Sequence, residues 1–348
     1  MAACGGHVAL VVMAVALLLF STIAATGAGA QNGPAEEAPV TPARTWAVSL
    51  RWENDTFGDT DRFYTNGAAA TLSHTGPSWA DLLFNPLPWG SGRRTVSYTL
   101  SQAIFTPEDT DRVIPNPTDR PYAGTLAFGL GLHVDQPNRY DGLRLVVGVV
   151  GPWSGAEETQ RRVHRLIGSG VPQGWDAQLH NEPILNLGYE HRRKYRLAGV
   201  ADGWSVEAIP VVALALGNLL TYVQLGGQFR VGYKIPQDFG TTFLRGMSEL
   251  PPPRSRPSEG SSAGESLGVY LHGGIGGSLV LHDMTLDGNT FKDSPSVDKR
   301  LLVPIAGGGI GIGNRRFLAT FSYSLLGKEF EGQRTAAKFG ALTVSYFF

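Results

Sequence analysis

The chain contains a single cysteine in 348 residues, Cys4, which lies ahead of an apolar run near the N-terminus. If that run is removed, the mature protein has no disulfide and no cysteine metal site. Neither sign of charge is in excess, because 29 Lys and Arg stand against 30 Asp and Glu. This balance argues against a nucleic-acid partner. Beyond residue 45 the sequence also lacks any apolar run long enough for a membrane-spanning helix.

The first 30 residues are typical of a targeting segment. The apolar run ALVVMAVALLLFSTIAA is followed by Ala28-Gly29-Ala30, a small-x-small cleavage pattern. We therefore predict a cleaved signal peptide over 1–30. A single transmembrane anchor is the alternative, because no Lys or Arg precedes the run. Residues 31–45 are rich in Pro, Ala and Glu and predict a flexible leader, and the Pro- and Ser-rich stretch Leu250–Ser266 predicts a long disordered loop.

From residue 46 onward the dominant pattern is alternation of apolar and polar residues, which predicts β-strands. Residues that share an apolar face are Trp46, Val48, Leu50 and Trp52 near the start, Val223, Leu225, Phe229 and Val231 further on, and Leu342, Val344, Tyr346 and Phe348 at the end. The runs reach about ten residues, the length that a tilted membrane strand needs, and aromatic residues lie near their ends. We therefore predict an all-β fold, an antiparallel transmembrane β-barrel over 46–348, rather than a soluble sandwich.

We expect about twelve strands, an even number, as single-chain bacterial barrels have. They cover 46–54, 63–74, 94–104, 121–134, 141–151, 181–194, 203–217, 220–234, 266–283, 300–313, 315–327 and 335–348. If both termini are periplasmic, the connections 54–62, 105–120, 152–180 and 284–299 face the outside. The long stretch 235–265 then fits poorly, because it falls on the periplasmic side, where turns should be short. We expect a monomer in the outer membrane of a Gram-negative bacterium.

The stretch ENDTFGDTDRFYTNG, from Glu53 to Gly67, concentrates oxygen-bearing side chains at the tip of the first predicted hairpin. By strand parity Asp55 continues the inward face of the first strand, and Asn54 lies at its edge. Asn and Asp oxygens at a rim are hard ligands suited to Ca²⁺. The spacing differs from that of an EF-hand, and a solvated tip rich in turn-forming residues is the alternative interpretation.

One clearly helical segment interrupts the strands. The sequence SGAEETQRRVHRLIGSG begins at Ser154, a good N-cap, and ends at Gly168, so we predict a helix in an extracellular loop. His164 shares a face of this helix with apolar residues, and a packed histidine is the ordinary interpretation of such a position. Asp176 and Glu182 follow in the next segment. A histidine base, carboxylates and a hydroxyl at one rim would suit metal-assisted hydrolysis.

Several long motifs, in order along the chain, resemble those of the outer-membrane lipid A 3'-O-deacylases. They are ENDTFGDTDRFYTNG, DRPYAG at 119–124, the Gln and His at 160 and 164, GWDAQLHNEP at 174–183, and the aromatic C-terminus. The resemblance spans almost all of the predicted mature chain. It implies a twelve-stranded barrel and a Ca²⁺-dependent hydrolase that removes the 3'-linked acyloxyacyl group of lipid A in the outer leaflet. Lipid A, or lipopolysaccharide, and the surrounding outer-membrane lipids are the partners it implies.

The resemblance assigns roles to four residues. The Asn-Asp pair of the family falls on Asn54 and Asp55, its hydroxyl residue falls on Thr65, and its catalytic histidine falls on His164. The implied mechanism uses His164 to take a proton from water, which attacks the ester carbonyl. Ca²⁺ near Asn54 and Asp55 then stabilises the oxyanion.

One part of the family pattern is missing from this sequence. The family uses a glutamate shortly after the histidine, where this chain has Ser169 and Gly170. Glu182 or Asp176 is the expected substitute, and we predict Glu182 as a third metal ligand beside the Asn-Asp pair.

Two other functions stay open on the sequence alone. An outer-membrane phospholipase A would use a His-x-Ser arrangement, but none of the eight histidines is followed two places on by serine. A non-enzymatic porin-like barrel would explain the strands but not the ordered motifs. Arg62, Arg112 and Arg120 lie at predicted extracellular tips, where they would either hold lipid A phosphates bidentately or remain solvated rim charges.

Overall fold

The computed structural model describes residues 45–55, 63–242, 250 and 267–348. The predicted signal peptide 1–30 lies outside these residues. So do the predicted leader 31–45, except Thr45, and most of the predicted loop Leu250–Ser266.

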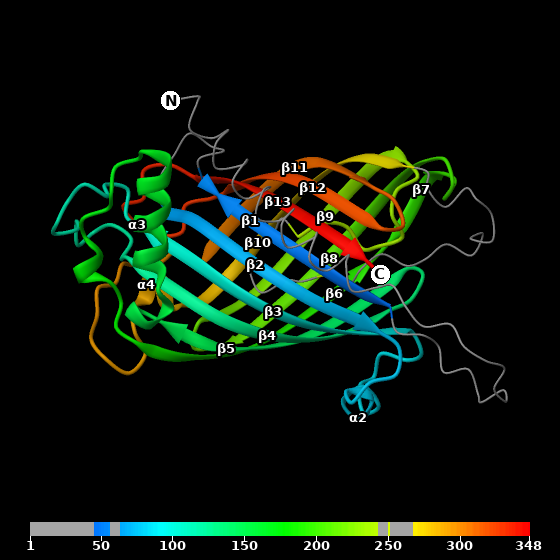
Figure 1. Ribbon diagram of the computed structural model, residues 1–348, viewed down its shortest axis with the longest axis horizontal. Coiled ribbons are helices and arrows are strands. Elements are labelled where there is room, and N and C mark those ends of the chain that lie inside the picture. The colour runs from blue at the N-terminus through cyan, green and yellow to red at the C-terminus, as the bar shows by residue number, and fades with distance from the viewer. Residues whose placement is uncertain (1–44, 56–62, 243–249, 251–266) are drawn as a thin grey trace, which may run out of the picture.

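Twelve antiparallel strands close into a barrel, as predicted (Figure 1). They are β1 (Trp46–Asn54), β2 (Phe63–Thr75), β3 (Arg93–Thr106), β4 (Ala123–Asp135), β5 (Arg139–Val150), β6 (Glu182–Arg193), β8 (Trp204–Gly217), β9 (Leu220–Tyr233), β10 (Gly268–Asp283), β11 (Leu302–Gly313), β12 (Phe317–Leu326) and β13 (Ala337–Phe347). Neighbours in sequence pair with each other, β1 pairs with β13, and β6 pairs with β8. Every strand of the closed ring therefore has a partner on both sides, which membrane-embedded strands require.

A thirteenth strand, β7 (Tyr195–Gly199), was not predicted. It pairs with the first residues of β8, and β6 pairs with the later residues of the same strand. The break between β6 and β7 is Lys194, whose Nζ donates to the main-chain oxygen of Asp238, 2.9 Å away. Sequence alternation cannot reveal such a break, because its cause is a contact with a segment far along the chain.

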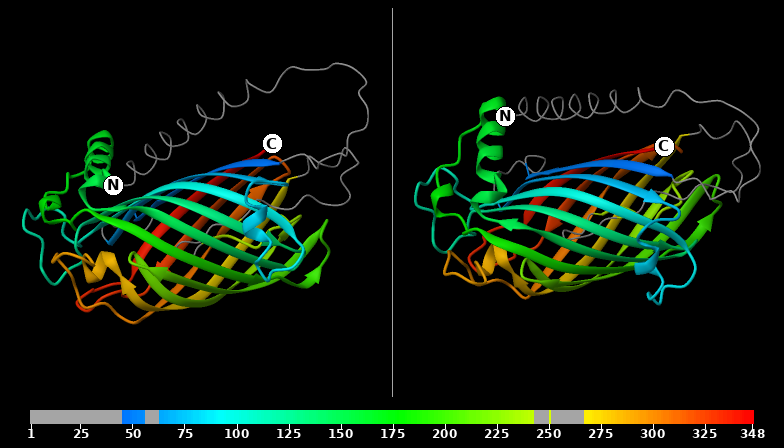
Figure 2. Two further views of the ribbon diagram at one scale, coloured as in Figure 1. Left: turned by 90° about the horizontal axis from the view of Figure 1, so that it is seen from below. Right: turned by 60° about the horizontal axis from the view of Figure 1, so that its bottom comes forward.

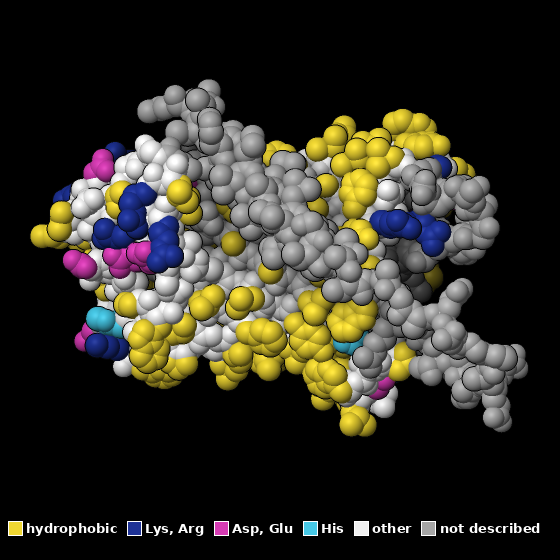
Figure 3. All heavy atoms as spheres, in the orientation of Figure 1, with side chains coloured by type: hydrophobic (Ala, Val, Ile, Leu, Met, Phe, Trp, Pro, Cys, Tyr) yellow, Lys and Arg dark blue, Asp and Glu magenta, His cyan; other side chains and the backbone are white. Residues whose placement is uncertain are grey.

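The two faces of the barrel wall differ in chemistry, as strand parity predicts. On β9, Val223, Phe229 and Val231 are exposed, whereas Gln224 and Arg230 are buried inside the barrel. Hydrophobic side chains cover much of the wall, and charged side chains gather at its two ends (Figure 3). Within the described residues, no helix combines the length and apolar character needed to cross a membrane.

The two ends of the barrel carry different connections (Figure 2). At one end, called here the helix end, lie α3 (Ala156–Ile167) and α4 (Met284–Asp287), with the short 3-10 helices η2 (Pro152–Ser154) and η3 (Trp175–Ala177). At the other end, called the terminus end, β1 begins, β13 ends, and the connection from β2 to β3 contains α2 (Asp81–Phe84). An apolar cluster that includes Phe63, Phe105 and Phe339 fills the barrel mouth at the helix end.

The connection after β9, which fitted the predicted topology poorly, enters the barrel. We call its described part, residues 235–242, the lumen plug. Arg230, fully buried, donates to Glu207 Oε2 at 2.5 Å and to Asp238 of the plug. Gln228 accepts from the backbone nitrogen of Thr241 at 3.0 Å. The described part of the long connection therefore binds inward-facing strand residues.

Further contacts hold the plug from β5 and β6. Arg192 Nη1 donates to the Phe239 oxygen at 2.8 Å, and the Phe239 ring lies 5.6 Å from that of Tyr140. Ile235 and Phe239 are 1% and 2% exposed. The lumen is therefore occupied near the terminus end by packed protein.

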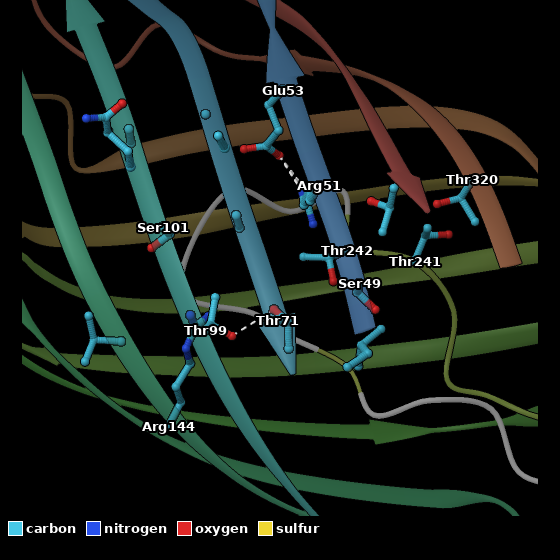
Figure 4. A pocket seen from close by; sticks show the side chains of 18 of the residues that line it. Ser49, Arg51, Glu53, Thr71, Thr99, Ser101, Arg144, Thr241, Thr242 and Thr320 are labelled. Atoms are coloured by element: carbon cyan, nitrogen blue, oxygen red, sulfur yellow. Dashed lines mark hydrogen bonds and ion pairs between the residues drawn. The ribbon is translucent and has the colours of Figure 1, made fainter. Parts of the chain in front are cut away.

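Between the plug and the apolar mouth lies a cavity of about 280 Å³. Hydroxyl groups dominate its lining, with Arg51, Glu53 and Arg144 as charged neighbours, and Thr241 and Thr242 come from the plug (Figure 4). None of the predicted site residues lines this cavity. The candidate site must therefore lie elsewhere, at the helix end.

Candidate active site

Asn54, Asp55 and Thr65 lie together where β1 ends and β2 begins, at the helix end. Asn54 Nδ2 donates to the Thr65 main-chain oxygen at 3.0 Å, and Thr65 Oγ1 lies 2.7 Å from Thr106 Oγ1 at the end of β3. All three predicted residues are at least nine-tenths buried, with Asp55 only 1% exposed. The structure thus brings the three together in a buried polar cluster that also includes Thr106, which the sequence did not single out.

The backbone around Thr65 is irregular. The β2–β3 register shifts between Tyr64 and Asn66, so Thr65 is left out of the regular pairing. Such a bulge re-aims a side chain, and here it accompanies the approach of Thr65 to Thr106. Phe63, two residues before Thr65, has a backbone φ of 70°, a left-handed conformation that is strained for a bulky side chain. The surrounding aromatic cluster holds that strain in place.

Helix α3 covers the outer end of β3 and β4. Gln102 Nε2 donates to the Ser154 oxygen at 2.8 Å. A Cβ on Gly124 would lie 2.2 Å from that of Ala156, so only glycine permits this close approach of strand and helix. The N-cap is Gly155 and not Ser154 as predicted, because Ser154 ends the preceding 3-10 helix and its hydroxyl donates to Gly151 O. The C-terminal end at Gly168 is confirmed.

His164 lies on α3 and is 6% exposed. Its Nδ1 is 2.5 Å from the main-chain oxygen of Gly170. Because a carbonyl oxygen only accepts, Nδ1 carries a proton, and in the neutral ring Nε2 is then the basic nitrogen. A Cβ on Gly170 would lie 3.8 Å from Asp111 Oδ1. Asp111 therefore supplies a carboxylate close to the place where the sequence lacks the family glutamate, and sequence reasoning missed it because it precedes β4.

Other motif residues support α3 from below. Gln160 Oε1 accepts from Trp175 Nε1 at 2.8 Å, and the Trp175 ring lies 4.9 Å from that of Tyr122. Trp175 and Tyr122 are fully buried with Ile104 and Ala156. The motifs GWDAQLHNEP and DRPYAG thus meet beneath the helix that carries His164.

Glu182 is placed apart from the other predicted residues. It begins β6, five strands from β1, and adjacent strands lie about 4.8 Å apart. It accepts from Asn218 Nδ2, Asn289 Nδ2 and Thr290 N at 3.2, 3.2 and 2.8 Å. These contacts join β6 to two other connections, so the structure does not bring Glu182 beside Asn54 and Asp55. Asp176, the other carboxylate considered, is exposed on η3.

The three arginines considered as phosphate ligands differ in environment. Arg120 is 0% exposed and donates to Glu329 at 2.9 Å and to Thr285 Oγ1 at 3.0 Å. It therefore lies inside the protein and not at a solvated tip, which corrects the expectation. Arg112 is exposed, and Arg62 lies outside the described residues. Next to Arg120, burial raises the pKa of the Asp119 carboxyl above its ordinary value, although two backbone amides donate to it.

The chemistry of Asn54 and Asp55 fits a hard cation in part. Amide and carboxylate oxygens are suitable Ca²⁺ ligands, and Asn54 donates through Nδ2, so its oxygen is directed away from that bond. In the described part of the chain, however, no group of three His, Cys, Asp or Glu side chains is arranged to hold a metal. Among the described residues, further Ca²⁺ ligands would be backbone, amide or hydroxyl oxygens, with water or substrate completing the set.

A closed barrel with an apolar outer wall is the architecture of an outer-membrane barrel protein, and this one carries a polar cluster at one rim. A family model described as outer membrane protein LpxR matches residues 11–348. The chain belongs to this family. It is therefore a lipid A deacylase of the outer membrane, which confirms that part of the predicted function.

One solved structure supports this fold. LpxR from Salmonella typhimurium superposes with a TM-score of 0.70 at 20% sequence identity, covering 87% of this chain and 100% of that one. The β domain of the Bordetella autotransporter BrkA gives a TM-score of 0.39 at 10% identity, covering 88% and 98%. A search of curated proteins found no match.

Proposed function

We propose that the chain hydrolyses the ester that links the 3' acyloxyacyl group to lipid A, with water as the nucleophile and His164 as the general base. The observation that carries the proposal is the polar cluster of Asn54, Asp55 and Thr65 at the helix end, together with His164 on the helix that covers the neighbouring strands. The family motifs supply the substrate class.

His164 is oriented for proton transfer by the main chain. The Gly170 oxygen, 2.5 Å from Nδ1, fixes the tautomer in which Nε2 accepts a proton. A water on the Nε2 side would lose its proton to the ring as it attacks the carbonyl. The ring is then a cation, and the Gly170 carbonyl oxygen at Nδ1 would favour that charge.

Asn54 and Asp55 would hold Ca²⁺. When bound, the ion supplies positive charge for the oxyanion that forms at the ester carbonyl. The two side chains are prepared for this by burial and by the bond from Asn54 to the β2 backbone, which fixes the amide orientation. Glu182 has no part in this proposal, because its contacts hold other connections.

Thr65 would orient water or an ester oxygen without attacking. Its hydroxyl is 2.7 Å from that of Thr106, and a threonine nucleophile would need an adjacent base instead. Either hydroxyl can donate to the other, because each both donates and accepts. Thr65 can therefore either donate a hydrogen bond to water or an ester oxygen, or accept one from water.

The helix end would face the outside of the cell. Most connections between the described strands at this end are long, with the two-residue turn 218–219 as an exception, whereas three at the terminus end, 136–138, 200–203 and 314–316, are short, as periplasmic turns are. The outward faces of β3–β5 below α3 expose Leu100, Phe128 and Leu145. An acyl chain of lipid A can lie along this apolar wall while its ester reaches the rim.

Neither alternative function gains support. A porin needs an open lumen, whereas packed side chains fill the mouth and the plug occupies the opposite end. A serine-dependent phospholipase needs an accessible serine and histidine. The Ser97–His133 contact of 2.8 Å lies inside the lumen near the terminus end, with each side chain 2% exposed.

The test is the mass of lipid A from cells that express the wild type or His164→Ala. We expect the wild type to release the acyloxyacyl group and His164→Ala to release none. His180→Ala is the matched control, since His180 is an exposed histidine in the same connection and contacts Asn289 through its backbone. It should keep full activity. An active, folded His164→Ala protein would remove the proposed base.

A further inference from the structure

The connection between β2 and β3, residues 76–92, is long for the terminus end, and we call it the foot. At this end the connections 136–138, 200–203 and 314–316 are short turns, and the connection after β9 is the other long one, which carries the lumen plug. Asp81 is the one charged residue in the foot, and Arg94 Nη1 lies 3.3 Å from its carboxylate. The single negative charge of the foot is therefore balanced by Arg94, and so low a content of charged residues is unusual for a segment that would lie in water.

One side of the foot packs on the outside of the barrel. Phe84 and Trp89, 3% and 6% exposed, form a cluster with Val96, Leu132 and Val134. These three strand residues point outward, because they alternate with lumen-facing neighbours such as Ser97 and His133. The foot thus covers part of the lipid-facing wall near its lower edge and does not close the barrel from below.

The other side of the foot is apolar and uncovered. Trp79, Leu82 and Leu83 are 55%, 81% and 45% exposed. Trp79 and the two leucines are adjacent along one short stretch around α2, so they form one patch and are not scattered single residues. A contiguous apolar patch of this kind marks a contact surface.

A row of outward-facing rings continues into the foot. The Trp46 and His74 rings are 4.7 Å apart, and the His74 and Tyr98 rings are 6.1 Å apart. Trp79 Nε1 then donates to Tyr98 Oη at 2.8 Å. The row crosses β1, β2 and β3 at the terminus end. Outward aromatic rings at a strand end are the girdle that marks the membrane–water boundary of a barrel.

We propose that the foot is a membrane anchor, with Trp79, Leu82 and Leu83 inserted into phospholipid at the boundary of the bilayer. Three observations favour lipid over a protein partner. The patch is continuous with the lipid-facing wall, the ring of Trp79 is joined to the girdle, and the single charge is neutralised. Apolar faces of segments that lie in the membrane interface are buried about 5–10 Å into the headgroup and acyl boundary. The proposal does not depend on the reaction assigned above.

The test labels a single introduced cysteine, which is possible because Cys4 is the one cysteine of the chain. In a Cys4→Ser background, Leu82→Cys carries an environment-sensitive fluorophore, NBD, and the protein is inserted into phosphatidylcholine vesicles with or without brominated acyl chains. Leu82 is exposed, so its replacement removes no packing. Asn138→Cys, in the exposed 136–138 turn at the same end, reports water, and Leu145→Cys, on the lipid-facing wall, reports lipid. Leu83→Cys repeats the measurement if the first label impairs folding.

We expect the Leu82→Cys label to emit at short wavelength and to be quenched by brominated lipid nearly as strongly as the Leu145→Cys label. The Asn138→Cys label should be quenched several times less. Emission and quenching at Leu82 equal to those at Asn138, in protein with the heat-modifiable gel mobility of a folded barrel, would overturn the proposal. That result would leave the patch as a surface for a periplasmic protein.

Discussion

Arg120 is the side chain whose loss we expect to destabilise the helix end most. It is 0% exposed, donates to Glu329 at 2.9 Å and to Thr285 at 3.0 Å, and its guanidinium lies 4.9 Å above the Phe105 ring. Arg120→Met keeps much of the volume but leaves Glu329, which is 5% exposed, without this cation. Breaking a buried pair from one side costs about 3–5 kcal/mol. We expect the free energy of unfolding to fall by about that amount.

The assay is urea unfolding in phospholipid vesicles, followed by tryptophan fluorescence and by heat-modifiable migration on a gel. Arg112→Met is the matched control, because Arg112 belongs to the same connection but is exposed, and its effect should stay within about 0.5 kcal/mol. The double variant Arg120→Met/Glu329→Gln should recover most of the lost stability, since no uncompensated charge then remains at position 329.

Two results would refute this reasoning. Arg120→Met could prove as stable as the wild type but raise KM for lipid A, in which case Arg120 contacts substrate phosphate and the burial is not maintained in the membrane. Alternatively, the double variant could be no more stable than the single one, in which case the energetic coupling between Arg120 and Glu329 is absent.

Three further predictions concern the metal, the rim hydroxyl and the plug. EDTA should stop deacylation and Ca²⁺ should restore it, and Asp55→Ala should raise the Ca²⁺ needed or end activity; an unchanged rate in EDTA, followed by lipid A mass, would contradict the role of the ion. Thr65→Ser should keep most activity and Thr65→Ala should lose about tenfold to a hundredfold, with no acyl group found on Thr65 by peptide mass spectrometry. Arg230→Met leaves the buried carboxylates of Glu207 on β8 and Asp238 in the plug without their cation, so it should lower the free energy of unfolding in urea by about 3–5 kcal/mol, whereas Arg193→Met, a change on the exposed end of β6, should change it by no more than about 0.5 kcal/mol.

Most of the fold could be predicted from the sequence, because a membrane barrel imposes a period of two on every strand. The lipid-facing and lumen-facing sides of β1, β9 and β13 follow directly from that period. What alternation could not reveal was the destination of the chain after β9. The plug is held by Arg192, Arg230 and Gln228, each of which looks like an ordinary inward polar residue until a partner is known.

The sequence predicted the site residues that belong to one motif, but it did not predict the contacts that distant segments make with them. Asn54, Asp55 and Thr65 belong to one continuous motif, so their proximity follows from a hairpin. Thr106 could not be found, because its contact with Thr65 depends on a bulge that shifts the β2–β3 register. Arg120 was misplaced for a related reason: its partner Glu329 is 209 residues away, and no local pattern indicates that the two meet inside the barrel mouth.

The lumen plug has a consequence for the order in which the barrel assembles. Its partners come from β5, β6 and β9, and Arg230 of β9 also contacts Glu207 of β8 and Tyr270 of β10, so these strands are neighbours in the sheet. Contacts between nearby segments close smaller loops and therefore form sooner than distant ones. The central strands of the sheet can thus curl around the plug while the β1–β13 seam is still open. Closure of that seam, which joins the two ends of the chain, is then the last step, and it seals four buried charges, Lys194, Glu207, Arg230 and Asp238, that could not enter a finished barrel.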